Sequence, residues 1–320
     1  NVYSDDITLN NPTKSGYAFV GWTEGTATFP VMLAQIPNGS TGDKAYTAHW
    51  VESKTFTLSG GVTLVMNKIS AGTFTMGCPT TELGYQSSNG EGNQHQVTLT
   101  RDFYIGVYEV TQEQYFAVMG TNPSNFKDGA AAGDSPTTTA SRPVETVSYN
   151  DITTASTGFL DKINTQLAGQ IPAGYKFDLP TEAQWEYACR AGTTSALNSG
   201  KNLINENFYN DSNLNEVAWY YYNSPGNTCS VGLKAPNVWG LYDMHGNVWE
   251  WCKDWYASNY YTTCGDCTDP AGPDSGSHRV NRGGSWVNFP SNCRSAYRSN
   301  YSPSYRDSNI GFRLVLVPQS

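Results

Sequence analysis

The last forty residues of the chain contain the pattern that most restricts its fold. This run, residues 279–314, begins near the motif RGGSW at 282–286 and ends with IGFRL at 310–314. Two glycines beside a large aromatic residue indicate a tightly turned, packed backbone, and the apolar run GFRLVLV predicts a buried strand. Asn, Ser and Tyr dominate the residues in between, as they do in an antibody paratope. Composition alone leaves open the alternative of a structural loop rich in Tyr and Asn.

Length and charge exclude several classes of protein. The 320 residues are enough for one large domain or two, and the net charge is −9. An acidic chain lacks the basic surface that binds nucleic acid, so we expect no nucleic-acid partner. Only 15% of the residues are charged, whereas Gly, Asn, Ser, Thr and Tyr are abundant, which is typical of exported proteins. No apolar stretch has the length of a membrane span.

The seven cysteines are too few and too irregularly spaced for a disulfide-based scaffold. Cys264 and Cys267, in the motif CGDC, form a local disulfide, stay reduced as a pair, or bind a soft metal. A zinc site would need a second ligand pair, and no second CxxC motif exists. Cys189 and Cys252 lie in apolar stretches and are expected to be buried as small hydrophobic residues. Because the number of cysteines is odd, at least one thiol is unpaired in any scheme.

Residues 1–52 are predicted to form a small β-rich module. The stretches AFVGW at 18–22 and AYTAHW at 45–50 alternate as strands do, and the turn PNGSTGD at 37–43 lies between them. The whole run, from PTKSGYAFVGW to YTAHW, resembles a bacterial surface repeat of the internalin B type. That resemblance implies a spacer in a cell-surface protein. His49 is a lone histidine in a strand pattern, and we expect it to be structural.

Residues 54–320 are predicted to form one α+β domain. Residues 62–66 and 72–77 are expected to pair as a hairpin, and 96–100 and 103–105 to form further strands. Thr111 should cap a helix, with Gln114 at the reciprocal position of a capping box. Asn150 and Asp151 should open a second helix that extends past residue 163. A third helix should begin after Thr181 and end at Gly192.

Seven motifs occur together in this domain: FTMG, TRDFYIGVYEVTQEQY, RPVETVSYNDI, FDLPTEAQWEYACRAGT, VGLKAPNVWGLYDMHGNVWEWCKDWY, RVNRGGSW and IGFRLV. In this order and spacing they resemble the formylglycine-generating-enzyme, or sulfatase-modifying-factor, family. The resemblance covers essentially all of residues 60–320. It implies a C-type lectin fold, in which short helices flank antiparallel strands and long loops form the functional face.

The oxidase activity of that family requires two cysteines five positions apart, which bind copper and attack a substrate cysteine. Here Cys293 matches the second cysteine, but the first position is Asn288. An amide supplies neither a thiolate nucleophile nor a soft ligand for copper, so we expect no enzyme activity and no catalytic cofactor. The alternative that remains is an enzyme of the family that acts through Cys293. His95, His245 and His278 do not have the spacing of an iron site, and His245 and His278 are expected to be structural.

A structural calcium ion is a further expectation from the resemblance. The triplets with which C-type lectins bind sugar through calcium, Glu-Pro-Asn or Gln-Pro-Asp with Trp-Asn-Asp, are absent. The family loop that matches residues 242–250 holds calcium, and its ligands would be the carboxylates of Asp243 and Glu250 with the carbonyls of Gly246 and Val248. Such oxygen donors suit Ca²⁺. The alternative is a loop held only by the packing of two tryptophans, Trp249 and Trp251.

The C-terminal segment resembles one branch of the family, the variable proteins of diversity-generating retroelements. In that branch, mutagenesis at adenines rewrites Asn-type codons near the C-terminus, which cannot produce Lys, Glu, Gln, Met or Trp, and residues 287–309 contain none of these five. Frame residues such as Arg282 would then hold the backbone. The predicted ligand-binding positions are Val287, Asn288, Phe289, Ser291, Asn292, Tyr297, Ser299, Asn300, Tyr301, Ser304, Tyr305, Asp307, Ser308 and Asn309. The tyrosines at 297, 301 and 305 are the first candidates for anchors, because buried aromatic residues dominate binding hot spots.

These patterns together predict a non-enzymatic binding protein that displays a diversified site. We expect its ligand to be a protein or a glycan and the chain to be a monomer. We expect it on the bacterial cell surface, at the extracellular face of the outer membrane, attached by a lipid anchor upstream of Asn1. A purely structural domain of a surface assembly is the remaining alternative.

Overall fold

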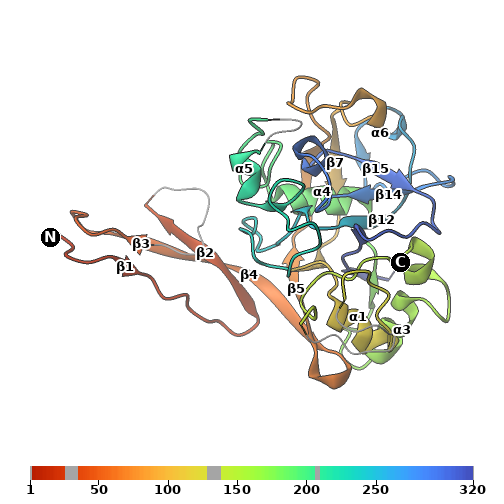
Figure 1. Ribbon diagram of the computed structural model, residues 1–320, viewed down its shortest axis with the longest axis horizontal. Helices are drawn as coiled ribbons and strands as arrows, with labels where there is room; N and C mark the ends of the chain where they lie inside the picture. The colour runs from red at the N-terminus through yellow and green to blue at the C-terminus, as the bar shows by residue number, and fades with distance from the viewer. Residues whose placement is uncertain (1, 26–34, 128–137, 206–209, 320) are drawn as a thin grey trace.

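The computed structural model describes residues 2–25, 35–127, 138–205 and 210–319, and it has the predicted α+β character (Figure 1). The strands are β1 Ile7–Thr8, β2 Tyr17–Glu24, β3 Gln35–Ile36, β4 Tyr46–Thr57, β5 Thr63–Ile69, β6 Gly72–Met76, β7 His95–Leu99, β8 Phe103–Gly106, β9 Tyr175–Asp178, β10 Ala218–Trp219, β11 His245–Gly246, β12 Trp249–Trp255, β13 Cys267–Thr268, β14 Arg279–Arg282, β15 Ser299–Tyr301, β16 Ile310–Gly311 and β17 Val315–Pro318. The helices are α1 Gln112–Met119, α2 Tyr149–Thr153, α3 Phe159–Gln166, α4 Glu182–Arg190, α5 Ser212–Asn215 and α6 Tyr260–Cys264, with short 3-10 turns at η1 Ser59–Gly61, η2 Ser87–Asn89 and η3 Pro290–Cys293.

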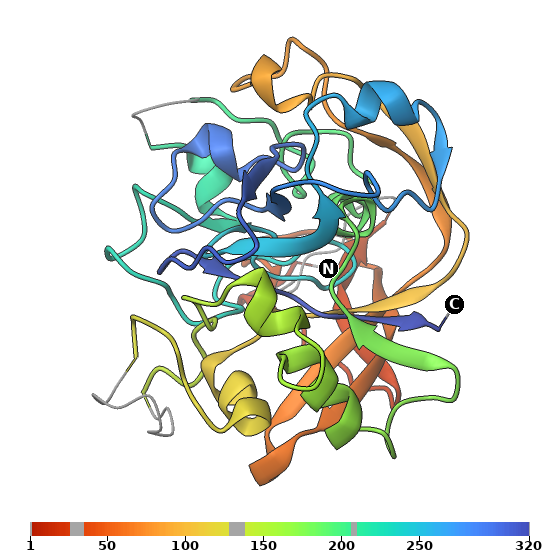
Figure 2. The same ribbon diagram turned by 90° about the vertical axis from the view of Figure 1, so that its right-hand side faces the viewer.

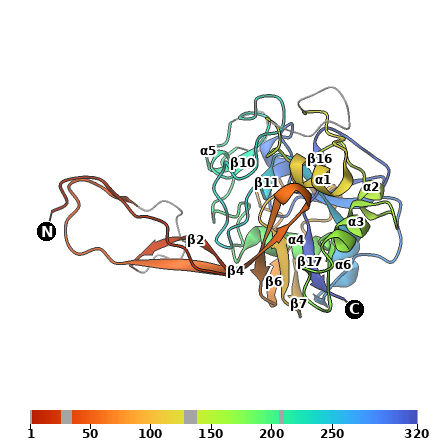
Figure 3. The same ribbon diagram turned by 90° about the horizontal axis from the view of Figure 1, so that it is seen from below.

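One long strand connects the N-terminal residues to the rest of the protein. Strand β4 pairs with β2 through residues 46–52 and with β5 through residues 53–57, so it belongs to a six-stranded sheet in the order β2-β4-β5-β8-β17-β9. The N-terminal part projects from the larger domain as an elongated arm (Figures 1 and 3). Glu52 accepts a hydrogen bond of 2.5 Å from the hydroxyl of Tyr104. The division into modules 1–52 and 54–320 stays a prediction, and β4 crosses that boundary without a break.

The predicted hairpin of residues 62–66 and 72–77 is wrong, although both strands exist. Strand β5 pairs with β4 on one side and β8 on the other, so neither of its edges is available to β6. Strand β6 pairs instead with β7, in a three-stranded sheet in the order β13-β7-β6. The predicted strands at 96–100 and 103–105 correspond to β7 and β8.

Side-chain caps fix the starts of the helices. Thr111 forms the expected capping box with Gln114 before α1, and Thr181 is the expected cap of α4 and forms a capping box with Gln184. The single helix predicted from residue 150 past 163 is wrong. Helix α2 is capped by Ser148 and ends at Thr153, and α3 begins only at Phe159.

The hydrophobic core lies on both faces of the six-stranded sheet. Along β8 the side chains alternate: Tyr104 belongs to one buried cluster, and Phe103 and Ile105 to the other. The first cluster is covered by α1 and α3, and the second by α4 (Figure 2). The last strand joins this arrangement, because Val315 faces the second cluster and Leu316 the first. The sheet is therefore a central layer with helices on both faces.

The apolar run near the C-terminus is buried, as predicted, but it forms two strands rather than one. Strand β16 pairs in parallel with β12, and β17 lies between β8 and β9 in the six-stranded sheet. Gly311 is required at the crossing point, because a Cβ atom there would lie 2.4 Å from the carbonyl oxygen of Val144. Residues 310–318 thus join the four-stranded sheet that contains β12 and β16 to the six-stranded sheet that contains β17.

Cys264 and Cys267 form a disulfide, which selects one of the three predicted possibilities. The other five cysteines are free, and Cys189 and Cys252 are fully buried, as predicted. Within the described residues, no helix combines the length and the apolar character that a membrane span requires.

Candidate functional site

The C-terminal segment, residues 282–309, has a charged inner side and an outer side on which most of the side chains are uncharged. Its inner side carries three arginines, Arg282, Arg294 and Arg298, whose side chains are at most 1% exposed. A buried guanidinium is stable only when ion pairs and hydrogen bonds compensate for the lost hydration. All three have such partners outside the segment, and they fix its backbone to the rest of the fold.

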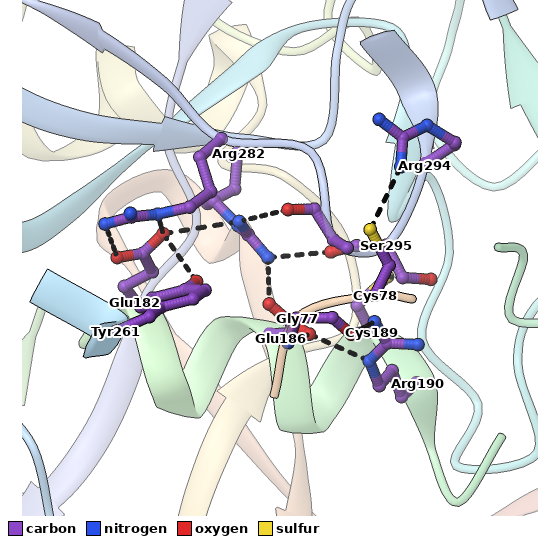
Figure 4. A network of polar contacts seen from close by, with 12 residues as sticks. Gly77, Cys78, Glu182, Glu186, Cys189, Arg190, Tyr261, Arg282, Arg294 and Ser295 are labelled. Carbon is purple, nitrogen blue, oxygen red and sulfur yellow. Dashed lines mark hydrogen bonds and ion pairs between the residues drawn. The ribbon is translucent and has the colours of Figure 1, made fainter. Parts of the chain in front are cut away.

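Two of these arginines are bound by carboxylates of helix α4, and Figure 4 shows Arg282 beside Glu182 and Glu186. Arg282 donates to Glu182, with an Nη1–Oε1 distance of 3.2 Å, and to Glu186. It also donates to the carbonyl oxygens of Ser295 and Ala296, at 2.7 and 3.0 Å, inside the segment itself. Arg298 forms a two-pronged contact with Glu182, at 2.6 and 2.8 Å. Helix α4 therefore holds the start and the middle of the segment at once.

The third arginine fixes the segment to the loop before β7. Arg294 pairs with Glu82 at 2.7 Å and with Glu91 at 2.6 Å, and it donates to the carbonyl oxygen of Gly84 at 2.7 Å. Gly84 has a φ of 84°, and a Cβ atom there would lie 2.9 Å from the Cβ of Ser291. The loop and the segment are thus in direct contact.

The outer side carries the predicted ligand-binding residues. Thirteen of the fourteen are exposed or half-buried: Val287, Asn288, Phe289, Asn292, Tyr297, Ser299, Asn300, Tyr301, Ser304, Tyr305, Asp307, Ser308 and Asn309. Ser291 differs, because it is 3% exposed and lies in η3 against Gly84. The Ser291 side chain therefore lies inside the protein, unlike the other thirteen.

Contacts between these residues connect the outer side into one surface. The indole nitrogen of Trp286 donates to the carbonyl oxygen of Ser308 at 3.1 Å, which joins the two ends of the segment. The rings of Tyr301 and Tyr305 are stacked with 4.6 Å between centroids, and the hydroxyl of Tyr305 donates to Asp307 at 2.9 Å. We call this surface, made of the thirteen outward residues, the outer strip.

The later part of the segment is held differently from the earlier part. The main-chain N–H groups of Thr146 and Asn150 donate to the carbonyl oxygens of Asp307 and Pro303, both at 3.0 Å. Arg306 forms a two-pronged ion pair with Asp151, at 2.7 and 2.5 Å, but the arginine side chain is 50% exposed. Main-chain hydrogen bonds and one exposed ion pair therefore fix the backbone of the later part, whereas buried arginines fix the backbone of the earlier part.

Sequence reasoning did not find the residues beside the outer strip. Tyr221 and Tyr222, after β10, contact Phe289 with ring centroids 5.1 and 6.5 Å away. A hollow of about 500 Å³ is lined by residues of the outer strip and by the loops that follow α1 and precede α2: Pro123, Ser124, Asn125, Lys127, Thr146, Asp307 and Ser308. No local pattern links these distant stretches, so only the tertiary structure reveals them.

Cys293 and His245 are buried together beneath the segment. Cys293 is fully buried beside Leu197 and Tyr220, and burial raises the pKa of its thiol to about 12. His245 accepts a hydrogen bond from the main chain of Asn198 and donates from Nδ1 to the carbonyl oxygen of Cys293, at 2.6 Å. Burial lowers the pKa of His245 to about 4, so the ring is neutral. His245 therefore serves as a structural hydrogen-bonding residue.

The loop expected to hold calcium fits the ion only in part. Asp243 is 1% exposed, one of its oxygens accepts from Gly232 N–H at 2.7 Å, and its Oδ1 has no hydrogen-bond partner among the described residues. Glu250, in contrast, already accepts from Arg313 at 2.8 Å and from the indole of Trp185 at 2.7 Å. Asp243 therefore has an oxygen atom that could bind the ion. The oxygens of Glu250, in contrast, would have to bind the ion and Arg313 at the same time. Trp249 and Trp251 are buried, as the packing alternative requires.

Comparison with known proteins identifies the family. Residues 62–317 match the sulfatase-modifying factor enzyme 1-like domain. The chain belongs to this family. Its α+β fold is the C-type lectin fold that the sequence resemblance implied, and the assignment covers the domain that contains the outer strip.

Two solved structures share the fold. Treponema denticola variable protein 1 is 34% identical, with a TM-score of 0.67, and the match covers 83% of this chain and 99% of that protein. PvdO from Pseudomonas aeruginosa is 29% identical, with a TM-score of 0.63, over 79% of this chain and 94% of that one. The first of these confirms the predicted resemblance to the variable-protein branch.

Enzymes are also among the relatives. The formylglycine-generating enzyme of Thermomonospora curvata is 33% identical over 202 residues, which are 60% of this chain and 61% of the enzyme. The chaperone protein LppX of Paenibacillus barcinonensis is 29% identical over 72% of this chain and 85% of that protein. The match to the Thermomonospora curvata enzyme therefore covers about three fifths of the length of that enzyme.

Proposed function

We propose that this family member is a non-enzymatic binding protein whose outer strip is a diversified ligand-contact surface. The observation that carries the proposal is the separation of residue types within one segment. Between residues 282 and 298 the arginines enter the protein and are bound by carboxylates, while the side chains of Val287, Asn288, Phe289, Asn292 and Tyr297 are exposed or half-buried. Exchange of the outward residues leaves the buried ion pairs in place. A prearranged backbone also reduces the entropy lost on binding.

A genomic observation tests diversification directly. We expect the DNA near this gene to contain a near-copy of the codons for residues 279–314, beside a reverse transcriptase gene. The copy should differ from the coding sequence only at adenines, and the mismatches should fall on the outer strip. Absence of both the copy and the reverse transcriptase would contradict retroelement diversification, and the outer strip would then be an ordinary loop of the family.

The second candidate is an oxidase that acts through Cys293, and the similarity to formylglycine-generating enzymes favours it. Its chemistry would need a reactive thiolate at residue 293. The thiol is fully buried with a raised pKa, and the side chain at 288 is an amide that accepts a hydrogen bond from Ser285. An assay with copper and a cysteine-containing substrate peptide decides between the two. We expect no turnover above that of the Cys293→Ser variant.

We further propose that the protein acts at the extracellular face of a bacterial outer membrane, as a monomer, held by a lipid anchor upstream of Asn1. The resemblance of the N-terminal arm to a surface repeat supports this location. Protease treatment of intact cells should remove the protein, whereas an intracellular control protein should survive. Failure of protease to reach it would contradict surface display.

We also propose a structural calcium ion in the loop of Asp243, Gly246, Val248 and Glu250, supported by the buried, unpaired Oδ1 of Asp243. An ion bound only by the folded state raises the melting temperature as its concentration rises. Calcium should therefore raise the melting temperature above that in EGTA, and the Asp243→Asn variant should respond less. Equal melting temperatures in calcium and EGTA would contradict the site.

A further inference from the structure

We propose that the ligand-contact surface extends beyond the outer strip to fixed residues led by Tyr221, and that it binds a protein with an apolar, uncharged contact patch. This inference rests on the proposed function, because it assigns further residues and a ligand class to the same surface. Tyr221 lies outside the segment that is proposed to vary. It would therefore provide a constant contact beside changing ones.

Tyr221 is unusually exposed for a large aromatic residue and is directly attached to the outer strip. Its side chain is 53% exposed, and its ring centroid lies 5.1 Å from Phe289 and 5.2 Å from Tyr222. Its main-chain N–H donates to the carbonyl oxygen of Asn288 at 3.0 Å. A change of side chain at 288 leaves this main-chain hydrogen bond intact, so Tyr221 keeps its place when the outer strip changes.

The residues around Tyr221 hold it in a prearranged position. Tyr220 is fully buried, and its hydroxyl accepts a hydrogen bond from Asp211 N–H at 2.8 Å. The Asn223 side chain accepts from Tyr220 N–H and donates to the carbonyl oxygen of Ala218, both at 2.8 Å. Ser224 donates to the carbonyl oxygen of Trp286 at 2.9 Å. An exposed aromatic ring on such a rigid base loses little entropy on binding, as hot-spot residues require.

A second fixed region borders the other end of the outer strip. The hollow of about 500 Å³ has Asn125 and Thr146 on one side and Asp307 and Ser308 on the other. Buried Glu145 fixes the first side, because it accepts from Asn125 N–H at 2.9 Å and from the hydroxyl of Thr146 at 2.6 Å. One side of the hollow is thus constant and the other belongs to the outer strip.

The chemistry of the surface favours a protein ligand. Tyr221, Val287 and Tyr305 are large apolar or aromatic residues, and they are exposed by 53, 39 and 39%. The charge of Arg306 is paired with Asp151, and the outer strip and the hollow contain one carboxylate, Asp307, and one ammonium group, Lys127, so the positive and negative charges there balance. The outer strip and the fixed residues beside it number about twenty, which matches one side of a standard protein–protein interface. One or two sugar rings would contact far fewer.

A selection experiment tests the inference without knowledge of the natural ligand. The full chain is displayed with residues 287–289, 297, 299–301, 304, 305 and 307–309 randomised, and binders are selected against purified lysozyme as the probe. In parallel, the same library is selected against immobilised oligosaccharides. Several independent lysozyme binders are then purified, and the Tyr221→Ala change is made in each. Tyr17→Ala is the matched control, because Tyr17 is 42% exposed but lies on the arm.

Tyr221→Ala should raise Kd at least about fivefold in most of the binders, which corresponds to the 1 kcal/mol threshold of a significant interface residue. Asn125→Ala should have a smaller effect and Tyr17→Ala none, with unchanged melting temperatures. If binders depend on the randomised residues but not on Tyr221, the inference fails and the proposed function survives. If no binders emerge from either selection, the proposed function fails and the inference falls with it. If binders are obtained only against oligosaccharides, the proposal that the ligand is a protein is contradicted.

Discussion

The two halves of the C-terminal segment, residues 282–298 and 299–309, are held to the rest of the protein by different interactions. Both display polar and aromatic side chains on a fixed backbone. In the first half, three buried arginines are bound by carboxylates of α4 and of the loop at 82–91. In the second half, main-chain hydrogen bonds and the exposed Arg306–Asp151 pair hold the chain. The same residue type therefore has a large structural role in one half and a minor one in the other, and burial decides which.

This difference sets how freely the outer side can change. In the first half, inward and outward residues alternate closely: Ser291 and Arg294 are buried, whereas Asn292 is half-buried. In the second half, every residue from 299 to 309 is either exposed or half-buried. The first half is the more rigid support, and the second half is the more permissive display surface.

The largest effect should come from breaking the buried network of the first half. Arg282→Ala removes one cationic partner from each of two buried carboxylates, Glu182 and Glu186. Removal of one partner of a buried ion pair lowers the free energy of unfolding by about 3–5 kcal/mol. Chemical denaturation should show this loss in the free energy of unfolding, or the variant should not fold. A loss below about 1 kcal/mol would mean that the network is not what holds the first half.

Replacement of a small side chain by a large one should destabilise the protein at an inward position of the segment but not at an outward one. Ser291→Tyr introduces a ring against Gly84, in a space where even a Cβ atom on that glycine would lie 2.9 Å from Ser291. Such overpacking costs about 1–3 kcal/mol. The matched change Ser304→Tyr, at an exposed position, should leave the free energy of unfolding within about 0.5 kcal/mol of the native value. Equal effects of the two changes would remove the distinction between the two sides.

The support beneath the first half should also respond to pH. Burial, together with the nearby Glu182 carboxylate, raises the pKa of Asp254 to about 7, whereas an unfolded carboxyl has a pKa of about 3.9. Its contribution to stability is present in full below pH ~4 and is lost as pH rises through about 7. Asp254→Asn keeps an oxygen that can accept the hydrogen bond from Glu182 N–H but removes the titration. The variant should gain about 2–3 kcal/mol over the native chain between pH 5 and pH 8.

Denaturation at the two pH values measures this difference. The Asp307→Asn variant is a suitable control, because Asp307 lies at the surface of the second half. A constant difference between the native chain and Asp254→Asn from pH 5 to pH 8 would mean that Asp254 does not titrate in this range.

The smallest effect should come from the exposed pair of the second half. Arg306→Ala removes an ion pair whose arginine is 50% exposed, and such pairs contribute about 0–1 kcal/mol. The free energy of unfolding should fall by no more than that, and less in high salt because exposed charges are screened. A loss as large as that of Arg282→Ala would show that both halves depend equally on their arginines.

The sequence alone determined those features that depend on nearby residues. The capping box at Thr111, the cap at Thr181, the buried GFRLVLV run and the family all follow from local patterns. The prediction failed where pairing is not local, as for β5 and β6, which lie in different sheets.

Only the tertiary structure decided the partners of the segment. Arg282 is a hundred residues from Glu182, and Arg294 is more than two hundred from Glu82. It also placed Ser291 inside the protein and Tyr221 beside the outer strip. Local patterns set the direction of a chain and the burial of its faces, because they act over a few residues. Which charges meet, and which fixed residues border a displayed surface, depends on how distant elements pack, and no local pattern encodes that.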